Sequence, residues 1–136
     1  MIKILLVDDS VVIRKAVKQL LPEKGLVSVV GECSDGRDVL DFLKNNEVDT
    51  ILMDFSMKYI GGVEATKLVS EKYPNIKTIG FSSHSDSNYR NAMLAAGASD
   101  YIVKGVEIEV IRERIKALMY RQPVLIKVTI SNKIEA

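Results

Sequence analysis

Short apolar runs followed by polar residues are the feature of this sequence that most limits the folds it can adopt. Five such runs, mostly β-branched or rich in leucine, occupy residues 2–7, 27–30, 50–53, 77–81 and 101–103. Continuous apolar character over so few residues is typical of strands buried on both faces, as in a parallel sheet. The sequence therefore predicts five short strands.

Segments with helical spacing of apolar residues separate these runs. They cover residues 13–21, 39–43, 63–73, 87–96 and 107–121. Pro22 and Pro74 stop the first and third segments, and Gly97 stops the fourth. Regular strand and helix alternation predicts a parallel sheet covered by helices on both faces, with right-handed crossovers. The predicted fold class is α/β, a (βα)5 doubly wound sandwich.

The composition argues against several classes of function. The formal net charge is +1, and no basic block could neutralise several phosphates, so we expect no direct nucleic-acid binding. Cys33 is the one cysteine, which excludes a disulfide framework and indicates a small apolar side chain near the core. No apolar run approaches the roughly 18 residues of a membrane span. Acids directly after the first run are unlike a signal peptide. We expect a cytoplasmic protein that does not associate with membranes.

Polar side chains follow four of the predicted strands, at the edge where open α/β sheets bind ligands. These residues are Asp8, Asp9, Asp54, Ser82 and Lys104. Three carboxylates at one edge cannot all stay ionised without a cation, and Mg²⁺ prefers oxygen ligands. A carboxylate nucleophile beside a hydroxyl and an ammonium group suits phosphoryl transfer. The pattern therefore indicates a phosphate site with Mg²⁺ as its cofactor.

Each of these residues also has an ordinary structural explanation. Acids at strand ends often cap helices or form turns, and Asp9 with Ser10 before an apolar helix fits that explanation. Lys104 alone is typical of a solvated lysine, and Ser82 alone of a turn. The interpretation as a site depends on all of them meeting at one edge of the sheet.

Four motifs stand in order along residues 1–120: LVDDS at 6–10, ILMDFSM at 51–57, FSS at 81–83 and AAGASDYIVK at 95–104. Together they resemble the receiver domain of two-component response regulators. The segments VVGE at 29–32 and YIVKG at 101–105 resemble receivers of nitrate-response transcription factors in particular. The resemblance implies a flavodoxin-like sheet with strand order 2-1-3-4-5, as in chemotaxis regulators.

The resemblance assigns the acceptor and the metal ligands. Asp54 would accept a phosphoryl group from the phosphohistidine of a sensor histidine kinase or a histidine phosphotransfer protein. Asp8 and Asp9, with Asp54 and the backbone carbonyl of Ser56, would hold Mg²⁺.

The resemblance also implies a switch. Ser82 and Lys104 would bind the phosphoryl oxygens, and Tyr101 would be the aromatic residue that follows Ser82 inward, although a partly buried strand tyrosine is the alternative. Ser56 and His84 would border the phosphoryl group and modulate its hydrolysis, with plain solvent exposure as the alternative for His84. The fourth helix, fifth strand and fifth helix would then present a changed face to a downstream protein.

The sequence departs from the family pattern at three positions. Lys58 and Gly105 stand where proline is usual, and Gly61 stands where aspartate is common. We expect Gly61 and Gly62 to make the loop before the third helix more mobile. We also expect the change to Gly105 to loosen the placement of Lys104.

The predicted function is that of a signalling switch, not an enzyme that acts on other molecules. The chain would be a single-domain regulator or the receiver of a transcription factor. Lys58 and Gly105 keep open the alternative of a pseudo-receiver that binds proteins without being phosphorylated. A flavodoxin-like enzyme would need a glycine-rich loop where the acids at 8–9 stand, and aspartyl phosphatases generally place their nucleophile after the first strand.

The predicted domains are a receiver over residues 1–121 and an extension over residues 122–136. Apolar residues alternate in the extension, which is a strand pattern: Val124, Ile126, Val128 and Ile130. An exposed strand tends to pair with its own sheet, a second copy or another partner. We favour a homodimer through this extension, or through the switching face, over a terminus without function.

Removal of the extension is therefore expected to convert a dimer into a monomer. The check is the solution mass, by light scattering, of the whole chain and of a version that ends at Gln122. Identical monomeric masses would deny the extension this role.

Overall fold

The computed structural model describes residues 1–120, and the predicted extension over residues 122–136 lies outside that range. Five parallel strands form one sheet in the order β2-β1-β3-β4-β5. The strands are β1 (Ile2–Val7), β2 (Val27–Cys33), β3 (Thr50–Met53), β4 (Lys77–Ser82) and β5 (Asp100–Val103). This arrangement confirms the predicted fold class and strand order.

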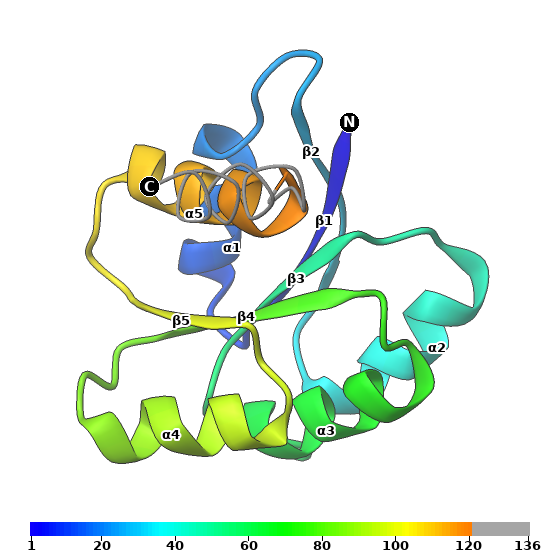
Figure 1. Ribbon diagram of the computed structural model, residues 1–136, viewed down its shortest axis with the longest axis vertical. Helices are drawn as coiled ribbons and strands as arrows, with labels where there is room; N and C mark the ends of the chain where they lie inside the picture. Colours follow the sequence, from blue (N-terminus) through cyan, green and yellow to red (C-terminus); the bar gives the residue numbers. More distant parts are fainter. Residues whose placement is uncertain (121–136) are drawn as a thin grey trace, which may run out of the picture.

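The helices cover both faces of the sheet, as Figure 1 shows: α1 and α5 lie on one face, and α2, α3 and α4 on the other. They are α1 (Val11–Leu20), α2 (Val39–Asn45), α3 (Gly62–Lys72), α4 (Ser87–Ala96) and α5 (Ile108–Tyr120), with a short 3₁₀ turn (Gly36–Asp38) before α2. Within the described part of the chain, none of these helices has the length and apolarity needed to cross a membrane.

Two hydrophobic clusters fill the space between the sheet and its helices. Along β1, Leu5 and Val7 belong to the cluster under α2, α3 and α4, whereas Ile4 and Leu6 belong to the cluster under α1 and α5. Successive side chains of a strand point to opposite faces, so the central strands are buried on both. This rigid centre fixes where β1 and β3 end.

The two edge strands differ from the prediction of strands buried on both faces. β2 runs to Cys33, three residues past its predicted end, and Val30 is 37% exposed. Among the residues that the structure describes, β2 pairs only with β1 and β5 only with β4, so these two are the edge strands of the described sheet. Val103 of β5 is accordingly only half-buried.

Local contacts explain where two helices begin and end. The Ser10 hydroxyl accepts a hydrogen bond from the Ile13 N–H (3.2 Å) and caps α1, so the capping role that the sequence left open for Asp9 belongs to Ser10. Asp86 caps α4 in the same way. Gly97 ends α4 with φ of +117°, a conformation that favours glycine.

The loop that joins β3 to α3 is tied to a buried carboxylate. Asp35 accepts hydrogen bonds from the backbone N–H groups of Tyr59 (2.8 Å), Ile60 (2.9 Å) and Arg37 (3.0 Å). Burial acts to raise the pKa of Asp35, but these three donors hold it below its ordinary value. Asp35 therefore fixes the middle of the loop that the glycine pair alone predicted to be mobile.

Gly62 is required in this loop by the close approach of another backbone segment. A Cβ atom there would lie 2.1 Å from the Asp54 carbonyl oxygen and 3.0 Å from the Phe55 Cα. Neither backbone atom can move without displacing Asp54, which directly follows β3.

We predict that Gly62→Ala lowers the free energy of unfolding by about 1 to 3 kcal/mol, the usual cost of an overpacked site. The matched control is Gly61→Ala, because a Cβ atom there meets only the Phe55 carbonyl oxygen at 3.2 Å and φ is −75°. Urea unfolding of the three proteins measures the difference. Equal losses for both variants would contradict the steric explanation.

Candidate functional site

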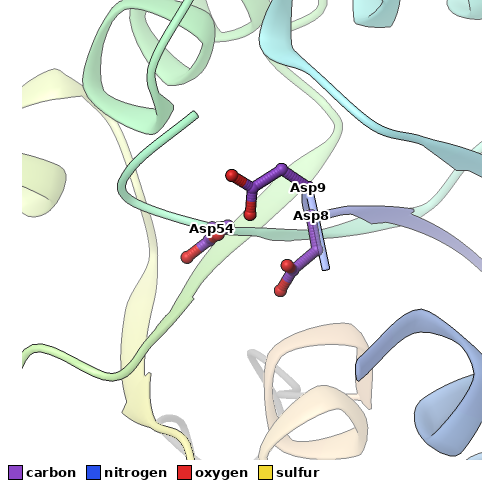
Figure 2. A group of neighbouring side chains, drawn as sticks. All are labelled: Asp8, Asp9 and Asp54. Atoms are coloured by element: carbon purple, nitrogen blue, oxygen red, sulfur yellow. The ribbon is translucent and has the colours of Figure 1, made fainter. Parts of the chain in front are cut away.

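Three carboxylates meet where two neighbouring strands end, as Figure 2 shows. Asp8 and Asp9 directly follow β1, and Asp54 directly follows β3; one carboxylate oxygen from each lies within 4.8 Å of the others. The register of the sheet brings them together, because Val7 pairs with Met53 and the Asp54 N–H donates to the Val7 carbonyl (2.8 Å). Asp8 and Asp54 are buried, whereas Asp9 is exposed.

One ammonium group serves two of these carboxylates. The Nζ atom of Lys104 lies 2.7 Å from the Asp8 Oδ2 and 3.4 Å from the Asp54 Oδ1. The Lys104 backbone N–H donates to the Ser82 carbonyl (2.8 Å), which continues the pairing of β4 with β5 by one residue. Despite the glycine at position 105, the structure places the Lys104 side chain against both acids.

The site carries more negative charge than its lysine neutralises. Burial, followed by the charge of Asp8, raises the pKa of Asp54 to about 6, and Lys104 offsets this only in part. The Asp8 Oδ2 is buried, and among the described residues its polar neighbour is the Lys104 ammonium group at 2.7 Å, which Asp54 shares. Three carboxylates with one shared cation, at least two of them buried, form a set of oxygen ligands that fits a hard divalent cation.

Most of the predicted site residues line an open cleft of about 400 Å³. Its walls include Asp9, Asp54, Ser56, Ser82, Ser83, His84 and Lys104, together with Ser10 and Ile13 of the α1 segment. Asp8 and Tyr101 are buried and do not line it. The structure thus brings the acids, the hydroxyl and the ammonium group to one edge of the sheet, as the sequence predicted.

Ser82 and Tyr101 are both bound to the backbone of His84. The Ser82 hydroxyl accepts from the His84 N–H (3.3 Å), and the Tyr101 hydroxyl donates to the His84 carbonyl (2.7 Å). The Tyr101 ring is 6% exposed and lies over Gly80, where a Cβ atom would be 2.4 Å from its Cδ1. Gly80 therefore provides the space that the ring occupies.

The side chains of Ser56 and His84 meet at the rim of the cleft. The Ser56 hydroxyl lies 3.4 Å from the His84 Nε2, so two loops that are 28 residues apart in the sequence approach each other there. His84 is half-buried, not freely exposed.

The sequence analysis missed several residues that shape the site. Asp35 stands in a Ser-Asp-Gly segment that is typical of a turn, and its bonds to the loop after Asp54 depend on the tertiary structure. Arg14 donates from Nη1 to the Asp8 carbonyl and pairs with Glu32 at 3.1 Å. The sequence offered one indication of this contact, because Arg14 lies in the first turn of the helix that follows Asp8. Tyr89 of α4 packs against Phe55 and His84, and no local pattern marks this contact.

Comparisons with known proteins identify the family. A family model described as the response regulator receiver domain matches residues 4–116. The response regulator UvrY of Escherichia coli (strain K12) is 37% identical over 105 residues, which cover 77% of this chain and 48% of UvrY. The transcriptional regulatory protein DegU of Brevibacillus brevis is 32% identical over 117 residues, which cover 86% of this chain and 50% of DegU. The chain thus spans about half the length of these curated relatives.

Among solved structures, the response regulator domain of Thermotoga maritima CheB is similar in fold. Its TM-score is 0.81 at 28% sequence identity, over 90% of this chain and 99% of that one. The family match covers every residue of the cleft, and the strand order agrees with the resemblance seen in the sequence. The chain therefore belongs to the response regulator receiver domain family of two-component systems.

Proposed function

We propose that Asp54 accepts a phosphoryl group from the phosphohistidine of a sensor histidine kinase or a histidine phosphotransfer protein. The observation that carries this proposal is the meeting of three carboxylates, the Ser82 hydroxyl and the Lys104 ammonium group at one edge of the sheet. In this role the chain is a signalling switch: it catalyses only its own phosphorylation and dephosphorylation.

The geometry around Asp54 suits a nucleophile. The Phe55 N–H donates to Oδ1 (2.9 Å), and Lys104 lies on the same oxygen, which orients Oδ2 as the attacking atom. A bond forms between this oxygen and phosphorus, and the P–N bond breaks with its electron pair returning to the imidazole nitrogen. Lys104 and Ser82 then hold phosphoryl oxygens.

Asp8, Asp9, Asp54 and the Ser56 backbone carbonyl are the groups that would hold Mg²⁺. When bound, this ion would neutralise the charge of the acids and of the incoming phosphoryl oxygens. Arg14 supports this ligand set through its bond to the Asp8 carbonyl, which fixes the start of the segment between β1 and α1.

Phosphorylation would shift the population of two arrangements of the segment after β4. The phosphoryl group adds charge and acceptor oxygens, and an arrangement with Ser82 turned toward it gains more from them. Tyr101 shares the His84 backbone with Ser82, so the change would reach the face formed by α4, β5 and α5. A downstream protein, or a second copy of the chain, would bind to that face in its changed form. Ser56 and His84, at the rim, would modulate hydrolysis of the aspartyl phosphate.

Two settings for this switch follow from the comparisons. UvrY is named a response regulator and DegU a transcriptional regulatory protein, and the matched segments cover only about half of each. The chain would act as a single-domain regulator that docks on a target, or as the receiver of a longer regulator.

We predict that acetyl phosphate adds one phosphoryl group to the protein, and that both Mg²⁺ and Asp54 are required. Intact mass spectrometry measures the addition, with and without EDTA. Asp54→Asn should remain unmodified, whereas the control Asp41→Asn, on an exposed acid of α2, should be modified like the wild type. Absence of modification in the wild type would reject the proposal in favour of a pseudo-receiver that binds proteins without phosphorylation.

Asp54→Asn is also expected to stabilise the metal-free protein at high pH. Because the pKa of Asp54 is raised from 3.8 to about 6 in the folded state, the fold favours the protonated carboxyl. The resulting stability is complete below about pH 4 and is lost as the pH rises through about 6.

At pH 8 the variant should therefore exceed the wild type by about 3 kcal/mol in free energy of unfolding, and the difference should shrink toward pH 4. Guanidinium unfolding in EDTA across this range measures it. A difference that does not change with pH would contradict the raised pKa of Asp54.

A further inference from the structure

Three aromatic rings from three segments of the chain pack together beside the cleft. Phe55 follows the acceptor Asp54, His84 lies two residues after Ser82, and Tyr89 belongs to the first turn of α4. We call these three residues the aromatic triad. The Tyr89 and His84 rings are stacked, with centroids 4.1 Å apart and planes at 9°. Phe55 meets Tyr89 edge to face at 4.8 Å and 81°, and His84 at 5.8 Å and 75°.

The other two rings of the triad restrain the imidazole of His84, whereas its peptide groups are held by hydrogen bonds. The N–H and carbonyl of His84 are bound by Ser82 and Tyr101. Its imidazole has a 3.4 Å contact with the Ser56 hydroxyl, which is long for a hydrogen bond. The face-to-face contact with Tyr89 is therefore the main restraint on the imidazole, and it comes from a helix outside the acceptor cleft.

The place of the imidazole matters because His84 lines the cleft together with Asp54 and Ser56. Hydrolysis of an aspartyl phosphate there needs water to reach phosphorus. The water oxygen bonds to phosphorus, the P–O bond to Asp54 breaks with its electron pair returning to the carboxylate, and both water hydrogens leave on dihydrogen phosphate. A ring held at the rim narrows the approach of that water.

We propose that Tyr89 is a positioning residue for the aspartyl phosphate: its ring holds the His84 imidazole at the rim of the cleft and thereby lengthens the life of the phosphoryl group. This inference rests on the proposed acceptor role of Asp54. It adds a residue of α4 to those that control hydrolysis of the aspartyl phosphate. The contact with His84 is made by the ring of Tyr89, not by its hydroxyl. Tyr89→Phe should accordingly preserve it.

The test compares decay of the phosphoryl group among variants at one pH. Protein loaded with acetyl phosphate and Mg²⁺ is freed of donor, and the phosphorylated fraction is followed by intact mass. We expect Tyr89→Ala and Tyr89→Leu to shorten the half-life about 3- to 10-fold, the range that corresponds to loss of one aromatic contact. Tyr89→Phe should decay like the wild type. Arg90→Ala, at the next and exposed position of α4, is the matched control and should also match the wild type.

A second measurement separates positioning of His84 from general damage. His84 is the only histidine in the chain, so its imidazole C–H signals are unambiguous in a proton NMR spectrum. Stacking on Tyr89 should shield these protons in the wild type and in Tyr89→Phe, and the shielding should disappear in Tyr89→Ala and Tyr89→Leu. In a His84→Ala background, Tyr89→Ala should have no further effect on the half-life, because its effect passes through the missing ring.

The outcomes distinguish the two proposals. A wild type that takes up no phosphoryl group would overturn both. Normal uptake followed by the same half-life in wild type and in Tyr89→Ala or Tyr89→Leu would overturn the role of Tyr89 and leave the acceptor role intact. A short half-life in Tyr89→Phe, or further shortening by Tyr89→Ala in the His84→Ala background, would also overturn it. If Tyr89→Ala fails to fold, Tyr89→Leu, which keeps apolar bulk without a flat ring, supplies the same comparison.

Discussion

Two buried carboxylates that share one ammonium group are the interaction on which the rest of this structure depends. Asp8 and Asp54 lie at the ends of β1 and β3 with Lys104 at 2.7 and 3.4 Å from their oxygens. Removing both acids from water costs free energy that one lysine does not return, as the raised pKa of Asp54 reflects. The hydrophobic clusters on the two faces of the sheet hold the central strands in place against this cost. The buried acids thus lower the free energy of unfolding, and the hydrophobic packing offsets that loss.

The surroundings of the acids are fixed mainly through backbone atoms. Asp35 holds the loop after Asp54 by accepting from two of its N–H groups, and Gly62 lets that loop pass within contact of the Asp54 carbonyl. Arg14 binds the carbonyl of Asp8. Backbone contacts of this kind place the acids without adding further charged side chains to the cleft.

The sequence predicts the fold and the cleft residues because both depend on local patterns. Apolar runs that end in polar residues define the central strands, and the ends of parallel strands meet at one edge, so Asp8 and Asp54 converge in any sheet of this order. The pattern is less informative at the edges of the sheet. It predicts that β2 is fully buried, yet Val30 is partly exposed, because within residues 1–120 this strand has a neighbouring strand on one side only. Contacts such as Asp35 with Tyr59, or Tyr89 with His84, join distant segments and leave no periodic trace in the sequence.

His84 contributes to this site through two separate parts. Its peptide groups connect Ser82 to Tyr101, and any residue other than proline supplies the same N–H and carbonyl. Its imidazole lines the cleft and is held mainly by packing against Tyr89, with one long contact to the Ser56 hydroxyl. Substitution at this single position can therefore change the chemistry at the rim while the connection between Ser82 and Tyr101 persists. Under the proposed function, substitutions at this position would change the lifetime of the phosphoryl group while the backbone connection from Ser82 to Tyr101 stays the same.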